Sequence, residues 1–340
     1  MIYWEDIKIA FSILSFQKIW NALLLNISFY VSRWMKKPIV WAYPMAISVE
    51  PTTACNLECP ACPSGLREFS RPTGNMKEIV FQNIIFQLKE YLLHINFYFQ
   101  GEPLIHPKIF EWVRIAAQNK IYTLISTNAH FIDEMSAQKL VESGLHKIII
   151  SIDGMTQSTY EKYRQKGNVQ KVFQAIENII AAKQSLQSTT PIIVLQWIVF
   201  DHNLNELPLF IEYCKDKKLR YQIKTAQVYS VEQLQTLIPK HSQYTRYDLT
   251  STDKLKLQNP LYNHCWRMWA SCVFTQNGAV VPCCFDKDAK YEMGDIKSHS
   301  FKEIWHSKEY DLFRKKILHH RSQIDICTNC SEGSKVFSEI

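Results

Sequence analysis

The 340-residue sequence lacks the long apolar runs, export signal and repeats that would define a membrane, secreted or solenoid protein. No uninterrupted apolar run approaches the ~18 residues expected of a transmembrane helix. Glu5 and Asp6 stand where a signal peptide would carry positive charge. Low-complexity segments and internal repeats are also missing. We therefore expect one large α/β domain with a smaller partner domain.

A large excess of charge is missing as well, whereas cysteine is plentiful. The net charge is +7, and the basic residues are spread along the chain. We expect no nucleic-acid partner, although this balance is compatible with an anionic substrate or an anionic membrane surface. The ten cysteines fall largely in clusters. Without a signal peptide, such clusters favour metal binding in a reducing cytoplasm over disulfides.

The amino-terminal extension, residues 1–44, is apolar and helix-like, and it ends at Pro38 and Pro44. Its tryptophans and basic residues would suit a membrane interface. These residues are Trp4, Trp20, Arg33, Trp34, Lys36 and Lys37. A helical hairpin packed on the protein's own barrel explains the same pattern. We favour that interpretation over a peripheral membrane contact through residues 1–37.

From residue 45 onward, strand-like and helix-like segments alternate. The predicted strands span residues 45–50, 95–100, 122–127, 147–152, 192–200 and 221–225. The predicted helices span residues 76–93, 107–119, 131–143, 157–186 and 204–218. Such alternation is typical of a parallel sheet with right-handed crossovers. About six units, where a closed barrel has eight, predict a partial TIM-like (β/α)6 barrel over residues 45–245.

Three cysteines follow the first predicted strand. Cys55, Cys59 and Cys62 have the spacing Cys-x3-Cys-x2-Cys. The odd number is informative, because a tetrahedral zinc site needs four ligands and usually shows paired Cys-x2-Cys units. A 4Fe-4S cluster held by three thiolates has one iron without a protein ligand, and that iron can bind a small molecule. A zinc site completed by a distant ligand, or unrelated core thiols, are the alternatives.

Polar or glycine-containing clusters follow the first five predicted strands. They are the cysteine loop and residues 100–103, 126–128, 151–154 and 201–203. In parallel α/β barrels the loops at the carboxyl ends of the strands converge on one mouth, where the active site is built. Each cluster alone is explained equally well as a turn or a helix cap. Five of them at one end of the sheet favour a functional site.

The cysteine spacing resembles the signature of the radical S-adenosylmethionine (SAM) superfamily, and the resemblance covers about residues 45–227. It implies that the open iron of a 4Fe-4S cluster chelates SAM. The sequence Gln100-Gly101-Glu102-Pro103 is similar to the Gly-Gly-Glu-Pro motif that holds the SAM amino group in this family. Glu102 would be the charged partner of that ammonium group. Gln100 departs from the motif but keeps a backbone carbonyl available.

The resemblance implies further SAM contacts at the strand ends. Residues in the positions that bind the ribose and methionine portions of SAM are Ser126, Asn128, Ser151 and Asp153. Arg164 matches an arginine that pairs with the SAM carboxylate, for which a guanidinium fork is well suited. Ala61 is a second departure, because related enzymes usually have an aromatic residue there, near the adenine.

Six more cysteines appear after the alternation stops, at positions 265, 272, 283, 284, 327 and 330. Between two strand-like runs, Asn277-Gly278 predicts a hairpin with a two-residue type I′ turn. Counting outward from that turn pairs Cys272 with Cys283 on one face and directs Cys284 to the other face. By contrast, Cys214 lies on an apolar helix face and is predicted to be a buried core thiol.

The arrangement of these late cysteines resembles the SPASM/twitch extension of radical SAM enzymes. The shorter, twitch form carries one auxiliary 4Fe-4S cluster. Its implied ligands here are Cys265, Cys283, Cys327 and Cys330. Cys272 is the alternative to Cys265, and zinc is the alternative to the cluster. Residues 246–340 would form this small cysteine-rich domain, with a helix over residues 301–319.

The resemblance also implies a reaction. An external one-electron donor such as flavodoxin or ferredoxin would reduce the first cluster, and SAM would be cleaved to a 5′-deoxyadenosyl radical that abstracts hydrogen from a substrate C–H bond. We expect net oxidation of a small-molecule, sugar or lipid-linked substrate, with an electron-accepting or a structural role for the auxiliary cluster. A peptide-modifying maturase is the alternative within the family. A non-catalytic zinc-binding interaction protein is the alternative outside it.

Overall fold

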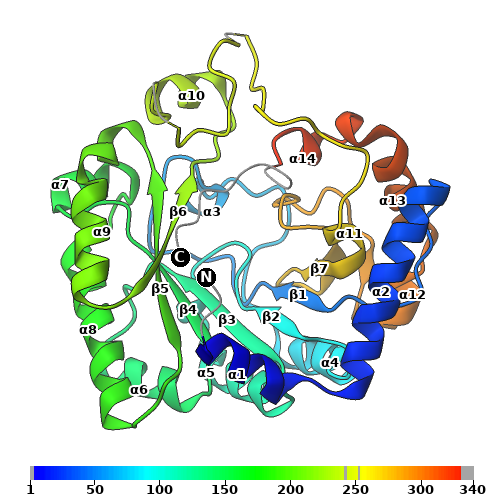
Figure 1. The fold of residues 1–340 in the computed structure, drawn as a ribbon, viewed down its shortest axis with the longest axis horizontal. Helices are drawn as coiled ribbons and strands as arrows, with labels where there is room; N and C mark the ends of the chain where they lie inside the picture. Colours follow the sequence, from blue (N-terminus) through cyan, green and yellow to red (C-terminus); the bar gives the residue numbers. More distant parts are fainter. Residues whose placement is uncertain (1–3, 241–242, 252, 331–340) are drawn as a thin grey trace.

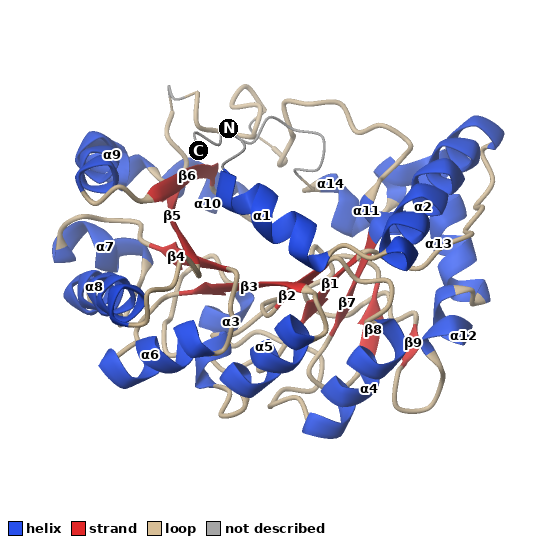
Figure 2. Ribbon diagram, turned by 60° about the horizontal axis from the view of Figure 1, so that its bottom comes forward, coloured by secondary structure: helices blue, strands red, loops and turns tan. Residues whose placement is uncertain are grey.

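A single nine-stranded sheet organises the protein, whose computed structural model describes residues 4–240, 243–251 and 253–330. The strand order is β6-β5-β4-β3-β2-β1-β7-β8-β9 (Figures 1 and 2). The strands are β1 (Ala46–Val49), β2 (His94–Asn96), β3 (Tyr122–Thr127), β4 (Lys147–Ser151), β5 (Ile192–Val199), β6 (Arg220–Thr225), β7 (Ser271–Phe274), β8 (Ala279–Val281) and β9 (Gly294–Asp295). Strands β1 to β6 are mutually parallel, which confirms the predicted partial barrel.

Helices cover the outer face of the parallel strands (Figure 2). They are α4 (Glu78–Leu88), α5 (Ile109–Gln118), α6 (Glu134–Glu142), α7 (Gln157–Tyr163), α8 (Val169–Ser185) and α9 (Leu207–Asp216). Their apolar faces build the core; Phe81 of α4 stacks on Trp112 of α5 with ring centroids 4.6 Å apart. Cys214 on α9 is fully buried in this core, as predicted. The sheet is therefore covered on one side, and its strand ends are available for a site.

Two predicted helices are each broken in the structure. The segment over residues 157–186 divides into α7 and α8, because the Asn168 side chain accepts the first backbone N–H groups of α8 and starts a new helix. The segment over residues 301–319 divides into α12 (Phe301–Trp305) and α13 (Lys308–His320). There the Ser307 hydroxyl caps α13 by accepting the N–H of Tyr310.

The predicted register of the β7–β8 hairpin is wrong by one residue. Val273 pairs with Val281 and Phe274 with Val280, so the loop has three residues. The N–H of Thr275 bonds to the Ala279 carbonyl, and Gly278 adopts a positive φ of 93°. A three-residue loop with glycine in a left-handed conformation is the next most common hairpin type. Cys272 is consequently not opposite Cys283, which removes the reason for treating these two cysteines as a pair.

The carboxyl-terminal segment joins the barrel by extending its sheet. Strand β7 pairs in parallel with β1, and Ile47 lies opposite Cys272. Beyond the strands, the buried Glu50 carboxylate accepts two hydrogen bonds from Arg71, at 2.7 and 2.6 Å, and one from the Gln276 N–H at 3.0 Å. Burial raises the pKa of Glu50, while Arg71 acts in the opposite direction. Through its bond to Gln276, the Glu50 carboxylate fastens the end of β1 to the hairpin loop.

Two helices, α1 (Trp4–Ile13) and α2 (Phe16–Met35), precede the sheet. Helix α1 lies on the side of the sheet opposite α4, α5 and α6 (Figure 2), where Ile9 packs against Leu124, Ile149 and Val194. Helix α2 lies beside α11 (Arg267–Ala270) at the edge of the molecule (Figure 1). Within the described part of the chain, none of the helices has the length and apolar character that crossing a membrane requires.

We predict that Glu50→Gln lowers the free energy of unfolding by about 3 kcal/mol, because it leaves the Arg71 charge buried without its partner. Urea denaturation of the reconstituted protein under anaerobic conditions, followed by circular dichroism, measures the change. The matched control is Glu111→Gln, which breaks an exposed ion pair with Lys108 and should have no measurable effect. Equal effects of the two substitutions would contradict the role given to the Glu50–Arg71 pair.

Candidate SAM and iron-sulfur site

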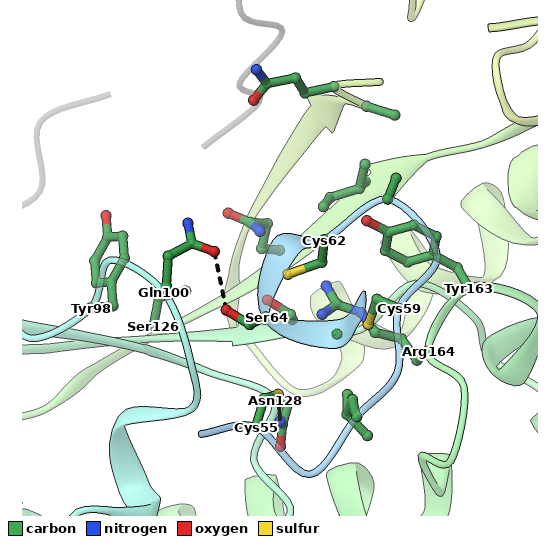
Figure 3. A pocket seen from close by; sticks show the side chains of 18 of the residues that line it. Cys55, Cys59, Cys62, Ser64, Tyr98, Gln100, Ser126, Asn128, Tyr163 and Arg164 are labelled. Carbon is green, nitrogen blue, oxygen red and sulfur yellow. Dashed lines mark hydrogen bonds between the residues drawn. The ribbon is translucent and has the colours of Figure 1, made fainter. Parts of the chain in front are cut away.

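A cavity of about 370 Å³ lies at the carboxyl ends of the parallel strands (Figure 3). It brings together all but one of the residues that the sequence predicts for the first cluster and SAM. Those lining it are Cys55, Cys59, Cys62, Gln100, Gly101, Glu102, Ser126, Asn128, Ser151 and Arg164. Residues separated by up to 109 positions in the sequence thus share one wall, which is what convergence of the strand-end loops predicts.

The three cysteines lie in a tight loop beneath the short helix α3 (Pro63–Leu66). The N–H of Cys62 donates to the Cys59 carbonyl at 3.2 Å. Gly65 permits the helix to approach, since a Cβ there would lie 2.5 Å from the Cys59 nitrogen. Burial raises the pKa of Cys55 to about 11 and that of Cys59 to about 12. Both thiols are therefore protonated until iron replaces the protons.

The Gln100-Gly101-Glu102 segment is fixed against this loop. The Ser64 hydroxyl donates to the Gln100 side-chain oxygen at 3.0 Å and accepts the Gly101 N–H at 2.7 Å (Figure 3). Gly101 has a φ of 73°, and a Cβ there would lie 2.3 Å from the Thr52 carbonyl oxygen. Only glycine fits this position. The side chain of Gln100, which replaces the first glycine of the motif, is thus used to hold α3.

The Glu102 carboxylate is almost completely buried at the centre of the site. It accepts hydrogen bonds from the Thr127 hydroxyl at 2.7 Å and from the N–H groups of Asn128 and Leu104 at 2.8 and 3.1 Å. Burial raises its pKa, and these three donors lower it. A carboxylate has about four acceptor positions, so one remains for a ligand ammonium group. Because Thr127 and Asn128 lie at the end of β3, Glu102 also holds the end of that strand in place.

Arg164 and Asp153 form a buried ion pair. The Arg164 Nε donates to Asp153 at 2.6 Å, and the other carboxylate oxygen accepts the Ile198 N–H at 2.7 Å. Asp153 does not line the cavity and lies behind Arg164. Among the residues that the structure describes, the two terminal guanidinium nitrogens of Arg164 have no hydrogen-bond partner. Arg164 is thus oriented through Nε, while its terminal donors can bind a carboxylate.

The sequence did not predict the apolar and basic walls of the cavity. Tyr163 and Phe200 pack with ring centroids 4.1 Å apart, close to Ala61, and both line the cavity. These rings supply apolar surface in the same cluster as Ala61. The basic residues are Lys224, Arg246 and Lys287. Lys224 is the last residue but one of the predicted strand 221–225 and could have been found there. The other two come from irregular segments without a signal.

The late cysteines gather around a buried arginine. Despite its burial, the pKa of Arg321 is raised, because Cys265, Cys330 and Cys327 lie nearby, and its guanidinium donates to the Cys330 sulfur at 3.7 Å. Burial raises the pKa of Cys283, and the nearby thiols of Cys284, Cys265 and Cys330 raise it further. These electrostatic influences indicate that the four cysteines that the sequence proposes as ligands lie near one another.

Cys272 lies apart from that group, in the core. It occupies β7 opposite Ile47 and is 1% exposed, and the charged neighbour that affects its pKa is Arg314. In the described ranges, no three Cys, His, Asp or Glu side chains lie close enough together to hold a single metal ion. The thiolates of a 4Fe-4S cluster bind separate irons, so a cluster does not require such a group.

Comparison with known proteins identifies two domains in the chain. Residues 49–206 match the family model of the Radical SAM superfamily, and residues 265–331 match that of the SPASM iron-sulfur cluster-binding domain. An S-adenosyl-L-methionine-dependent 2-deoxy-scyllo-inosamine dehydrogenase from Niallia circulans is 23% identical, over 85% of this chain and 93% of that protein. An AdoMet-dependent heme synthase from Methanosarcina barkeri is 22% identical, over 80% and 84%.

A solved structure shares the fold. The structure described as native anSMEcpe with bound AdoMet superimposes with a TM-score of 0.60 at 17% identity, over 86% of this chain and 92% of that one. The chain belongs to the radical SAM superfamily. More particularly, it is a radical SAM enzyme with a carboxyl-terminal SPASM domain. These two domains imply a SAM-binding 4Fe-4S cluster, SAM itself and auxiliary iron-sulfur binding.

We predict that Gly65→Ala removes the SAM-site cluster, because the added methyl group would overlap the backbone of Cys59. Iron per chain after anaerobic reconstitution should fall from about eight to about four, the content of one remaining 4Fe-4S cluster. Far-UV circular dichroism should be unchanged, since the affected helix has only four residues. Full iron content in the variant would show that α3 does not need this close approach.

Proposed function

We propose that the protein is a SAM-dependent oxidoreductase that removes hydrogen from an unactivated C–H bond of a small-molecule, sugar or lipid-linked substrate. The observation that carries the proposal is one cavity that contains the three cysteines and the SAM-binding candidates. The same cavity has a further wall, lined by Lys224, Arg246 and Lys287, where a substrate could bind. The names of the two relatives, a dehydrogenase and a heme synthase, support an oxidative outcome. An electron donor such as flavodoxin or ferredoxin would serve as the partner.

In this proposal each residue has a defined task. When bound together, the cluster and SAM supply a 5′-deoxyadenosyl radical. The protein therefore has to bind these groups, orient the substrate toward them and exclude water. Cys55, Cys59 and Cys62 hold the cluster. Glu102 and the Gly101 backbone receive the SAM amino group, and Arg164 receives the SAM carboxylate.

Other polar residues position these groups. Ser126, Asn128 and Ser151 line the cavity and would contact the remainder of SAM, whereas Asp153 orients Arg164. Cys265, Cys283, Cys327 and Cys330 hold the auxiliary cluster, and Arg321 offsets the negative charge of their thiolates.

The test is anaerobic reconstitution with iron and sulfide, followed by iron counting and a SAM-cleavage assay with dithionite as the reductant. The wild-type protein should bind about eight irons per chain and form 5′-deoxyadenosine. Cys55→Ala should abolish cleavage and about half of the iron, whereas Cys214→Ala, in the core, should change neither. Zinc without cleavage in the wild-type protein would instead support a non-catalytic zinc-binding protein.

The same assay separates the auxiliary ligands. Cys265→Ala should lose about four irons and keep uncoupled SAM cleavage, because the SAM-binding cluster remains. Cys272→Ala is the matched control and should keep all of the iron. If Cys272→Ala loses the iron and Cys265→Ala does not, the ligand assignment is reversed.

We also propose that the substrate carries an anionic group. Besides Arg164, which is paired with Asp153, the cavity is lined by Lys224, Arg246 and Lys287, and its one lining carboxylate among the described residues is Glu102. Arg246 is held in place by Thr225, through contacts of 2.6 and 3.1 Å. The wall beyond the SAM site therefore has an excess of positive charge that a phosphate or carboxylate would balance.

Lys224, on β6, is one of the three cations of that wall. Burial lowers its pKa to about 8, and the charges of Arg246 and Arg267 act in the same direction. In the part of the chain that the structure describes, no carboxylate forms an ion pair with Lys224. A bound anion would relieve this repulsion, so an anionic substrate fits the site better than a neutral one.

We predict that Lys224→Gln raises the KM of an anionic substrate about tenfold or more, the effect of losing one charge-assisted hydrogen bond. Phosphorylated, carboxylated and neutral sugars would be screened for stimulation of 5′-deoxyadenosine formation. Lys224→Arg should restore most of the affinity. In the wild type, KM should rise as the pH increases through about 8, since the protonated form is lost above that value.

Two results would contradict the anionic substrate. One is equal stimulation by neutral and anionic sugars. The other is loss of uncoupled SAM cleavage in Lys224→Gln, which would assign Lys224 to SAM. Neither result affects the proposed SAM chemistry.

A further inference from the structure

Helix α2 carries its large apolar side chains on the outside. Six of them form a continuous stripe at helical spacing: Phe16, Trp20, Leu23, Ile27, Tyr30 and Trp34. Phe16 and Trp34, at the two ends, are 83% and 84% exposed. Residues spaced by four and three positions lie on one face of a helix, so the stripe runs along its whole length.

The opposite face of α2, which contacts the protein, is partly polar. The Asn21 side chain donates to the Tyr43 carbonyl at 3.0 Å and accepts the Tyr43 N–H at 2.9 Å. Ser32 forms the same two-way contact with the backbone of Ile39, both at 2.9 Å. The Lys18 ammonium is buried and donates to the carbonyls of Asn119 and Lys120.

These polar contacts fix the rotation of α2 about its axis. Turning the helix to bury the apolar stripe would expose Leu25 and Phe29. It would also take Asn21 and Ser32 away from the backbone groups of Tyr43 and Ile39, and each such group left without a partner costs about 1–3 kcal/mol. The usual amphipathic arrangement of a surface helix is thus partly inverted. The polar contacts require the opposite face of α2 to pack on the protein, so the apolar stripe stays exposed when the protein is folded.

The apolar surface extends beyond the stripe. Of the 22 large apolar side chains that are exposed in the described chain, 11 lie between Phe11 and Trp41. Soluble monomers rarely expose contiguous apolar patches larger than a few hundred Å². Figure 1 shows α2 in the foreground near the right-hand edge of the molecule, in front of α12 and α13.

Charge identifies what this surface meets. From residue 7 to residue 49 the sequence has five basic residues and no acidic one. Three of the five, Arg33, Lys36 and Lys37, are exposed at the carboxyl end of α2. Tryptophan and tyrosine prefer the boundary between lipid and water, and lysine and arginine there bind anionic headgroups. Binding to another protein would not require a segment without acidic residues, whereas binding to an anionic lipid surface favours one.

We propose that the exposed face of α2 docks on the surface of an anionic lipid bilayer, with the helix lying in the plane of the headgroups. Trp20, Tyr30 and Trp34 would enter the interface, and Arg33, Lys36 and Lys37 would contact lipid phosphates. A helix of 20 residues is about 30 Å long, which is enough for a stable contact when it lies flat. This inference is independent of the reaction proposed above.

The experiment is co-sedimentation of the reconstituted full chain with vesicles. Vesicles of phosphatidylcholine with about 30% phosphatidylglycerol, an anionic surface, should retain the wild type far better than pure phosphatidylcholine. High salt should weaken binding. The double substitution Trp20→Gln/Trp34→Gln should reduce partitioning about tenfold or more. The matched control is Ile79→Gln/Phe86→Gln, which changes two exposed apolar residues of α4 and should bind as the wild type does.

Each contrary result overturns the proposal. Absence of wild-type binding to anionic vesicles would exclude a lipid surface. Equal binding to neutral vesicles, insensitive to salt, would exclude the role of Arg33, Lys36 and Lys37. A dimer in light scattering that disappears in the Trp20/Trp34 variant, without vesicle binding, would assign the face to a second copy of the chain. SAM cleavage by the variant reports that it is folded and should equal that of the wild type.

Discussion

The parallel pairing of β1 with β7 is the constraint on which the arrangement of the two cysteine sets depends. Glu50 follows β1 directly and strengthens this pairing, because its carboxylate binds both Arg71 and the Gln276 backbone. The cysteine loop begins directly after that point. Since a one-residue slip would reverse the faces of a strand, this register fixes the second cysteine set relative to the first. One continuous sheet therefore connects the parts of the chain that carry the two cysteine sets.

The cavity that results has two electrostatically different parts. Near the cysteine loop, the charged groups already have protein partners and keep only part of their hydrogen-bonding capacity free: Arg164 has Asp153, and Glu102 has three donors. Such groups are held rigidly before any ligand arrives, which suits a site that must orient a cofactor. Toward β6, Lys224 and Arg246 lack a paired carboxylate among the described residues. The difference explains why we assign the first part to SAM and the second to an anionic substrate.

The sequence predicted those elements whose structure depends mainly on their own residues. Strand-forming residues such as Tyr, Thr and Ile dominate β3, which was predicted with its observed bounds. The hairpin failed because Asn277-Gly278 suits both a two-residue and a three-residue loop. The Thr275 hydroxyl, which bonds to Asn277, accompanies the longer one. Arg246 and Lys287 reach the cavity from irregular segments, and only the folded structure could place them there.

Helix α2 shows the limit of hydropathy most clearly. The sequence favoured a helical hairpin packed on the barrel; α2 does pack on the protein, but its apolar stripe faces outward. Hydropathy ranks Asn21 and Ser32 as surface residues, yet their paired contacts with Tyr43 and Ile39 make their face the buried one. Burying a large apolar side chain is worth about 1.5–3 kcal/mol, so six of them forgo considerable stability in water. A fold that forgoes it along one complete face, beside a basic and acid-free segment, is understandable if that face is covered by lipid.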